Sequence, residues 1–191
     1  MTKIRFATNK DAEIITNIQL SAWRHSFTHV PQEVLAGLSV EKRLARWKNL
    51  IRMGEIQLYV LDKKDTGVVG FCQIGTASDI DLSQYCGKLK KLYIHPDYQT
   101  QGFGSLLFEY GIKKLREQLY TKLVLWVAVE NSLAISYYTR RGFQDDGARR
   151  IDTFTVDGSS ATYRLKDWDG SHTLKLAEVL EARYYKQFDG M

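Results

Sequence analysis

The chain has 191 residues, of which 44% are hydrophobic and 26% are charged, and it contains only two prolines. This composition excludes disordered, collagen-like and low-complexity classes, and the length fits one globular domain better than two. Lys and Arg outnumber Asp and Glu by 27 to 22, a net charge of +5, but the basic residues are scattered, which disfavours a nucleic-acid surface.

Helices dominate the expected N-terminal quarter. Alternation over residues 3–7 predicts a short strand, and the helix-start signal that follows predicts a helix over residues 8–25. A second, short helix is expected over residues 31–38. A third is expected over residues 39–54, with Ser39 as its N-cap and a glycine as its stop.

Strands dominate the next part of the chain. Residues 56–61 and 68–74 are rich in β-forming side chains and are joined by a polar turn, which predicts an antiparallel hairpin. A polar loop over residues 78–86 then leads to a strand over residues 88–94. Asp79 and Asp81 in this loop face solvent or attract a cationic ligand.

The second half alternates helices and strands. Helical periodicity predicts a helix over residues 102–119, and a continuous apolar run predicts a strand over 123–129 that is buried on both faces. A helix over 133–141 and strands over 143–154 and 161–165 complete one mixed α/β domain, residues 1–168. The remaining residues, 169–191, are expected to form a C-terminal helical extension, because five of their apolar residues show helical spacing: Leu174, Leu176, Val179, Leu180 and Tyr184.

The sequence carries no signal for a membrane, a secretory route or a metal. The longest apolar run, residues 123–129, is far shorter than the roughly 20 residues of a membrane-spanning helix. The N-terminus has no apolar signal-peptide core, so a cytoplasmic protein is expected. Cys72 and Cys86 cannot form a disulfide scaffold or a cysteine metal cluster, and we expect buried thiols and no metal.

The most informative stretch is Gln99-x-x-Gly102-x-Gly104, which joins a strand end to the start of a helix. Backbone N–H groups at a helix N-terminus bind phosphate oxygens, and glycine lets the phosphate approach closely. A Rossmann fingerprint would need glycine at Leu107, and the Gly-Lys-Ser/Thr of a P-loop is absent. A simple turn before a helix is the alternative.

A second element, Asn131-x-x-Ala134 followed by Tyr138 and Gly142-Phe143, lies about 30 residues further on. Together the two motifs resemble the GNAT superfamily of acetyl-CoA-dependent N-acetyltransferases, over roughly residues 3–165. The resemblance implies a mixed, mostly antiparallel central sheet with splayed fourth and fifth strands, flanked by helices. Thr100 stands where many members have glycine, a departure that weakens the resemblance little because that position varies.

The resemblance also implies a site. Asn131 would contact acetyl-CoA or fix the wall of the gap between the splayed strands, and Tyr138 would be the general acid toward the departing CoA thiolate. No metal is implied. The family's acceptor pocket would lie near Trp23, His25 and Phe27, at the end of the first helix. The cofactor would contact the backbone of Leu92, Tyr93 and Ile94 and the loop of Gln99, Thr100, Gln101, Gly102, Phe103, Gly104 and Ser105.

The pKa values of the reacting groups restrict the roles of the catalytic acid and base. A thiol has a pKa of about 8.5 and a tyrosine about 10, so Tyr138 is better understood as a hydrogen-bond donor that completes proton transfer late. Tyr137 and Tyr138 could alternatively both be packing residues. An amine near pKa 10.4 must lose a proton before attack. The base stays open among four residues: Glu130, Asp97, His95 and His25.

The sequence therefore predicts an N-acetyltransferase that moves an acetyl group from acetyl-CoA to a primary amine by direct attack in a ternary complex. The acceptor is a small-molecule or peptide amine. The alternatives are a CoA-binding sensor or interaction module without turnover and, third, a basic nucleic-acid-binding domain. A homodimer is expected from family habit alone.

Overall fold

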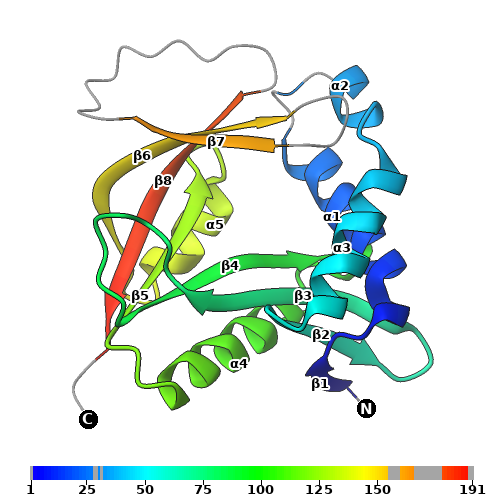
Figure 1. The fold of residues 1–191 in the computed structure, drawn as a ribbon, viewed down its shortest axis with the longest axis horizontal. Helices are drawn as coiled ribbons and strands as arrows, with labels where there is room; N and C mark the ends of the chain where they lie inside the picture. The colour runs from blue at the N-terminus through cyan, green and yellow to red at the C-terminus, as the bar shows by residue number, and fades with distance from the viewer. Residues whose placement is uncertain (1, 28–29, 31, 155–159, 166–177, 189–191) are drawn as a thin grey trace.

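The structure is a computed structural model that describes residues 2–27, 30, 32–154, 160–165 and 178–188. Within them, one twisted sheet has the strand order β1-β2-β3-β4-β5-β8-β6-β7 (Figure 1). All neighbouring strands are antiparallel except β4 and β5. The strands are β1 (Thr2–Phe6), β2 (Gln57–Lys63), β3 (Gly67–Thr76), β4 (Cys86–Ile94), β5 (Lys122–Ala128), β6 (Gln144–Phe154), β7 (Ser160–Leu165) and β8 (Glu178–Gln187).

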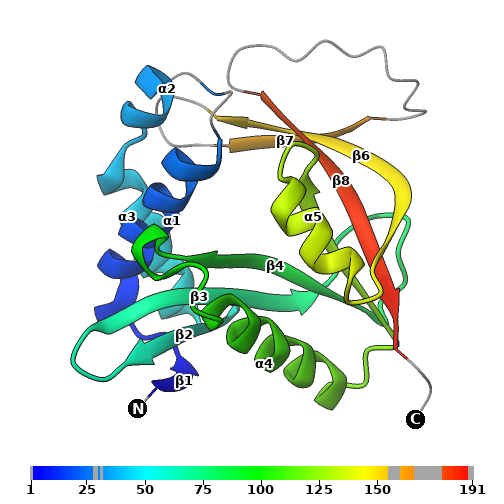
Figure 2. The same ribbon diagram turned by 180° about the vertical axis from the view of Figure 1, so that it is seen from behind.

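Helices cover both faces of the first half of the sheet. α1 and α3 lie together on one face, and α4 lies along β3 and β4 on the other (Figures 1 and 2). The helices are η1 (Asn9–Asp11), α1 (Ala12–Ser26), α2 (Gln32–Ala36), α3 (Val40–Met53), η2 (Pro96–Tyr98), α4 (Phe103–Glu117) and α5 (Ser132–Thr139). No helix among the described residues is long and apolar enough to cross a membrane.

The N-terminal half confirms the expected elements. The Ser39 hydroxyl accepts the backbone N–H of Lys42, and Gly54 ends α3 in the left-handed conformation, φ 68°. β2 and β3 form the expected hairpin. These elements were predictable because each has a local pattern of apolar residues and ends at a residue with an ordinary cap or turn role.

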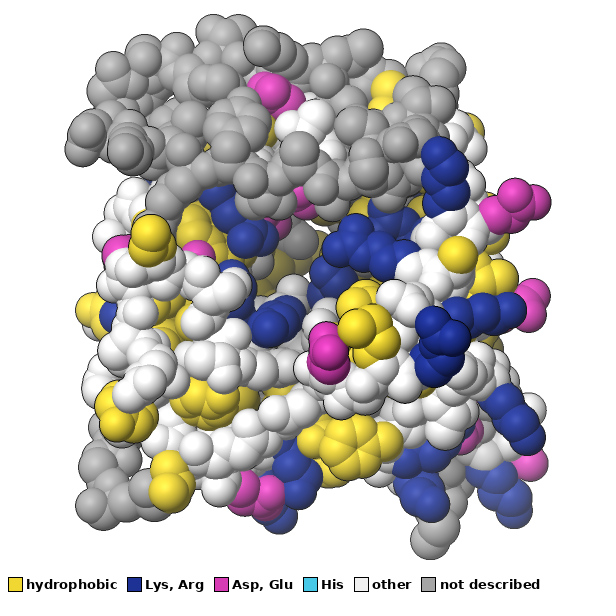
Figure 3. All heavy atoms as spheres, in the orientation of Figure 1, with side chains coloured by type: hydrophobic (Ala, Val, Ile, Leu, Met, Phe, Trp, Pro, Cys, Tyr) yellow, Lys and Arg dark blue, Asp and Glu magenta, His cyan; other side chains and the backbone are white. Residues whose placement is uncertain are grey.

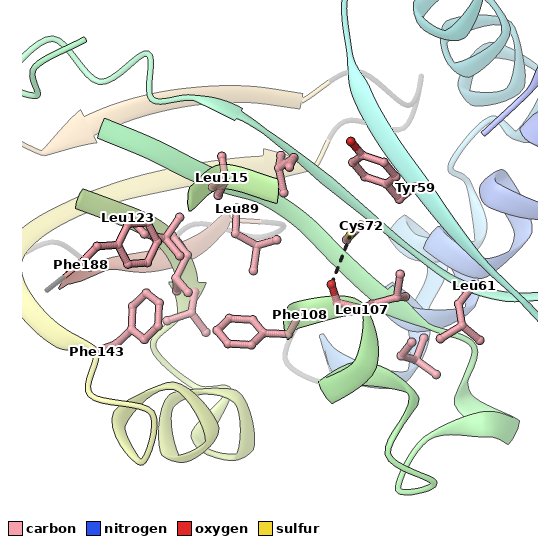
Figure 4. Close-up of a cluster of buried hydrophobic side chains, with 14 of the residues drawn as sticks. Tyr59, Leu61, Cys72, Leu89, Leu107, Phe108, Leu115, Leu123, Phe143 and Phe188 are labelled. Atoms are coloured by element: carbon pink, nitrogen blue, oxygen red, sulfur yellow. Dashed lines mark hydrogen bonds between the residues drawn. The ribbon is translucent and has the colours of Figure 1, made fainter. Parts of the chain in front are cut away.

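Alternation along β3 divides the core between the two faces. Phe71 packs with Ile15 and Trp47 beneath α1 and α3. The next residue, Cys72, faces α4, where its thiol lies 3.7 Å from the carbonyl oxygen of Leu107 (Figure 4). Cys72 and Cys86 are both buried free thiols, as expected.

The fourth and fifth strands splay, as the family resemblance implies. β4 and β5 pair in parallel from Cys86 with Lys122 as far as Leu89 with Leu125, and pairing ends there. At the same level the β3–β4 register shifts between Gln73 and Ile74, which marks a bulge in β4. The last residues of β4 therefore part from β5 and leave a gap between the two halves of the sheet.

The prediction of a C-terminal helix is wrong for residues 178–187. These residues form β8, which lies between β5 and β6 and pairs antiparallel with both. Residues 166–177 and 189–191 of the predicted extension lie outside the described residues. The extension thus contributes a central strand of the sheet rather than an added helix.

Gly70 on β3 is a position that tolerates no side chain. A Cβ there would lie 2.9 Å from the carbonyl oxygen of Tyr93 and 2.4 Å from Cδ1 of Ile94. Because a backbone atom must move, we expect Gly70→Ala to lower the free energy of unfolding by about 1–3 kcal/mol, measured by urea unfolding. Gly104→Ala is the control, since its Cβ meets no atom closer than 3.7 Å; equal stability of the two variants would contradict the prediction.

Candidate functional site

A cavity of about 790 Å³ lies where β4 and β5 part. Its wall comes from α1 and α3 on one side, β4, β5 and α5 in the middle, and β6 and β8 beyond. Figure 3 shows a hollow in this face of the molecule, with Lys and Arg side chains around it. The cavity is large enough for a drug-sized ligand, whose sites typically measure about 300–1,000 Å³.

One end of the cavity is the loop before α4. Gly102 is the N-cap of α4 with φ 83°, and no side chain caps this helix end. The first-turn N–H groups of Phe103, Gly104 and Ser105 have no acceptor within the helix, as at any helix start. Gln99 holds the loop by donating its side-chain amide to the carbonyl oxygen of Ile94 at 3.2 Å. The arrangement fits a phosphate group.

The cavity wall includes only part of the predicted cofactor loop. Gln99, Thr100 and Gly104 line it, together with the three residues at the end of β4. The others do not belong to the wall formed by the described residues: Gln101, Gly102, Phe103 and Ser105. Gln101 instead donates its side-chain amide to the carbonyl oxygen of Asp97 at 3.2 Å.

Thr100 has a backbone conformation that favours glycine. Its φ is 62°, in the left-handed region that glycine adopts freely and a β-branched residue does not. The threonine is therefore strained, by about 1–2 kcal/mol.

We expect Thr100→Gly to raise the free energy of unfolding by about 0.5–1 kcal/mol, because relief of this strain exceeds the added chain entropy of glycine. Gly102→Ala should have the opposite sign, since Gly102 has φ 83° and no atom within 4 Å of an added Cβ. Urea unfolding of both variants checks the pair. A less stable Thr100→Gly protein would contradict the assignment of strain.

The two tyrosines of α5 have different surroundings. Tyr137 donates its hydroxyl to Ser105 Oγ at 3.2 Å, and the Arg141 guanidinium stacks on its ring at 3.6 Å. Tyr138 packs its ring between Phe108 and Phe143 and lines the cavity. In the described part of the chain its hydroxyl makes no hydrogen bond. Burial raises the pKa of Tyr138 above its usual value of 10, and the neighbouring hydroxyls of Tyr137 and Tyr93 raise it further.

Asn131 lies at the start of α5, on the cavity wall. Its side-chain oxygen accepts the backbone N–H of Ala134 at 3.0 Å, so it is the N-cap of the helix that carries Tyr138. Both expected roles of Asn131, contact with acetyl-CoA and fixing the cavity wall, stay predictions.

The predicted acceptor residues line the other end of the cavity. The Trp23 indole N–H donates to the Tyr93 hydroxyl at 2.9 Å, and the Arg43 guanidinium lies 4.4 Å from the Trp23 ring centre. Phe27 packs beside Trp23, with ring centres 6.4 Å apart. His25 also belongs to the wall and is exposed. Trp23 thus packs in the hydrophobic core and also lines the cavity.

The four candidate bases separate into two groups. Glu130 and His25 line the cavity. His95 and Asp97 do not belong to its described wall and instead contact each other, with Nδ1 of His95 3.6 Å from an Asp97 carboxylate oxygen. The geometry thus favours the first pair.

Sequence reasoning missed a group of charged residues on the cavity wall. They are Arg43 and Arg46 on α3, Lys91 on β4, Arg150 and Asp152 on β6, and Glu181 on β8. No motif marks them, because they come from four separate elements. Glu181 was also missed because residues 169–191 were expected to form a helix outside the sheet. The one available signal was the surplus of positive charge.

The acidic loop does not supply a free anionic surface. Asp79 accepts from the Lys88 ammonium at 2.8 Å and from the Trp126 indole N–H at 2.9 Å. Asp81 forms an ion pair with Arg183 at 2.7 Å. Both carboxylates therefore bind cations of the sheet. Among the described residues, no three His, Cys, Asp or Glu side chains gather as a metal site would require.

Comparison with known proteins gives consistent matches. The sequence model of the acetyltransferase (GNAT) family matches residues 13–143. The uncharacterized N-acetyltransferase YuaI of Bacillus subtilis (strain 168) is 25% identical over 138 residues, 72% of this chain and 78% of YuaI. The ribosomal protein bS18-alanine N-acetyltransferase of Escherichia coli (strain K12) is 37% identical over 70 residues, 37% of this chain and only 47% of that protein.

A solved structure shares the fold over nearly its whole length. The paiA N-acetyltransferase from Thermoplasma acidophilum, crystallised in complex with coenzyme A, superimposes with a TM-score of 0.68 at 17% identity. The superposition covers 98% of this chain and 99% of that one. It confirms the predicted fold class, a mixed and mostly antiparallel sheet flanked by helices.

Proposed function

The chain belongs to the acetyltransferase (GNAT) family, and from that premise we propose that it moves an acetyl group from acetyl-CoA to a primary amine by direct attack within a ternary complex. The observation that carries the proposal is the cavity between β4 and β5, which joins a phosphate-binding helix start to Tyr138. A chain that only bound a phosphate group would not need this continuous gap in the sheet.

The residues present fit acetyl-CoA. The first-turn N–H groups of α4 and the glycines at 102 and 104 suit the pyrophosphate, and Gly104 leaves space on the cavity side. The unpaired edge of β4 beyond Leu89 offers backbone groups to the pantetheine amides, from Leu92 to Ile94. The paiA protein from Thermoplasma acidophilum binds coenzyme A on the same fold.

When bound, acetyl-CoA supplies a thioester carbonyl that an amine nitrogen can attack. In our proposal, backbone N–H groups near Ile94 polarise that carbonyl, and Tyr138 donates a hydrogen bond to the leaving sulfur. Burial keeps the Tyr138 hydroxyl protonated, which a donor requires. Glu130 or His25 removes the amine proton, directly or through water.

The acceptor class is a proposal from the cavity and the relatives. An amine acceptor agrees with the ribosomal-protein alanine that the Escherichia coli relative acetylates by its name. Assembly as a homodimer stays a prediction, which the mass in solution by light scattering would test.

The proposal is tested first by calorimetric titration of the protein with acetyl-CoA, and then by thiol release in the presence of a panel of primary amines. We expect micromolar binding and amine-dependent release of CoA. Binding without release for every amine would favour the CoA-binding sensor, and absence of binding would overturn the assignment. Steeply salt-dependent binding to duplex DNA would favour the nucleic-acid hypothesis instead.

A further inference from the structure

The acceptor end of the cavity has a surplus of positive charge. The described residues of the wall include five Lys or Arg side chains against three Asp or Glu, and the cations gather between α3, β4 and β6: Arg43, Arg46, Lys90, Lys91 and Arg150 opposite Glu130, Asp152 and Glu181. Lys and Arg side chains surround the hollow in Figure 3. A neutral amine alone would not require this charge.

Lys91 is the central cation of this group. It follows the β4 bulge, two residues before Tyr93, so both side chains leave the strand on the cavity face. Leu92 and Ile94 point to the opposite face and pack against the α4 cluster. Lys91 therefore faces α3 and β6 across the cavity.

Asp152 and Glu181 are the described carboxylates that interact electrostatically with the Lys91 ammonium. Within the described part of the chain it forms no ion pair, whereas Arg150 binds Glu181 at 2.5 Å. The pKa of Lys91 is lowered to about 8, first by burial and then by the charges of Arg46, Arg43 and Arg150, against the opposing effect of Asp152. Lys91 is half-buried; such a cation beside other cations is costly, and an anionic ligand lowers that cost.

The phosphates of acetyl-CoA do not explain this group. In the proposed function they occupy the start of α4, where Ser105 contacts Tyr137 of α5. Lys91 instead lies near charged residues of α3, β6 and β8. The charges of Arg46, Arg43, Arg150 and Asp152 act on the pKa of Lys91, and Lys91 in turn lowers the pKa of Glu181. The anion must therefore belong to the other substrate.

We propose that the acceptor is a small amine that carries a carboxylate, and that Lys91, with Arg46 and Arg43, binds this carboxylate. The inference rests on the proposed function and names its substrate class. Lys91 and Ile94 are three residues apart on β4, about 10 Å between their Cα atoms. The flexible lysine side chain shortens that span, so one small molecule can bring its amine to the thioester near Ile94 and its acid group to Lys91.

The first test compares matched acceptors with the wild-type protein. L-amino acids are assayed against the corresponding L-amino acid amides, and 2-aminoethyl phosphate against ethanolamine, each with acetyl-CoA. We expect kcat/KM for the carboxylates to exceed that for the amides by about 10- to 100-fold, the range of one charged hydrogen bond. Equal rates, or a preference for the amides, overturn the inference, and a preference for the phosphate over every carboxylate overturns the choice of carboxylate.

The second test removes the charge. Lys91→Met should raise KM for the carboxylate acceptors about 10-fold or more and leave KM for the amides and the Kd for acetyl-CoA nearly unchanged. Lys48→Met, an exposed lysine of α3 outside the cavity wall, is the matched control. Lys91→Met should unfold at the same or a higher urea concentration than wild type, because it removes a destabilised charge. An equal rise in KM for the carboxylate acceptors and for the amides overturns the inference.

If no acceptor in the panel is acetylated, a binding measurement tests the inference. The CoA-loaded protein is titrated with N-acetyl-L-amino acids and with their amides. Preference for the acids supports the inference, and equal or undetectable binding of both overturns it while the proposed function stands. A protein that binds no acetyl-CoA overturns the proposed function and the inference with it.

Discussion

Replacement of Tyr138 by phenylalanine is expected to lower kcat about 100-fold, the range of lost acid–base assistance, and to leave the Kd for acetyl-CoA within a few-fold. The ring can keep its packing against Phe108 and Phe143, so the loss reports the hydroxyl alone. Steady-state thiol release and calorimetry measure the two quantities. An unchanged kcat would remove the general-acid role and leave Tyr138 as a packing residue.

Tyr137→Phe is the matched control for this variant. It removes the hydroxyl that donates to Ser105 at 3.2 Å and leaves Tyr138 intact, so kcat should fall much less. The pH profile adds a second check. Because burial raises the pKa of Tyr138 above 10, the tyrosine stays protonated at lower pH, and kcat should show no alkaline loss from this group below pH 10.

The second large effect is expected at Gly104, where aspartate should weaken acetyl-CoA binding at least about 100-fold. Its carboxylate would compete for the first-turn N–H groups of α4 and repel the pyrophosphate. An acidic residue in the first turn of a helix is itself stabilising, by about 0.3–1 kcal/mol. The loss therefore cannot come from unfolding, and urea unfolding of the variant should confirm this.

Two further substitutions separate charge from size at this position. Gly104→Ala adds a Cβ that lies 3.7 Å from Ile94 Cγ1, an ordinary contact, so binding should change little. In Gly104→Asn the new side chain has nearly the size of aspartate but no charge. We expect the acetyl-CoA affinity of this variant to lie between those of the alanine and aspartate variants. Equal binding by the aspartate and asparagine variants would mean that no anion lies at the start of α4.

The elements that the sequence predicted well have a regular pattern of buried residues within a short stretch of the chain. In α3, apolar residues at helical spacing lie between the Ser39 cap and the Gly54 stop. In β5, Leu123, Val124 and Leu125 are all buried, so a continuous apolar run marks a strand covered on both sides. For these elements, the residues of the segment itself were sufficient to predict the helix or strand.

β8 could not be identified this way because it is a central strand with charged residues on it. Glu178 and Arg183 are buried, and Arg183 is neutralised by Asp81 and Asp146 from distant parts of the chain. Such ion pairs hide the period-two pattern, and the remaining apolar residues happened to fit a helical period. Partners that are remote in sequence leave no local signal.

The residues of the candidate site also divide into those that lie close together in the sequence and those that do not. Gln99 to Gly104 and Tyr138 lie in contiguous motifs, so their spacing was visible in the sequence. Lys91 and Glu181 meet only because the sheet brings β4 and β8 to one cavity. The sequence therefore indicated the loop before α4, Tyr138 and the residues at the end of α1, all of which reach the cavity wall, but not the charged residues of β6 and β8.

The central place of β8 has a consequence for how the protein becomes active. Ala128 pairs with Glu181, far away along the chain, and in the described residues β6 and β7 join the sheet through β8. Pairing across such a separation closes a long loop and is slow, whereas the β2–β3 hairpin is local. We therefore expect the β2–β3 hairpin to become ordered early in folding and the β6–β8 side of the cavity last, so that docking of one late strand completes the cavity.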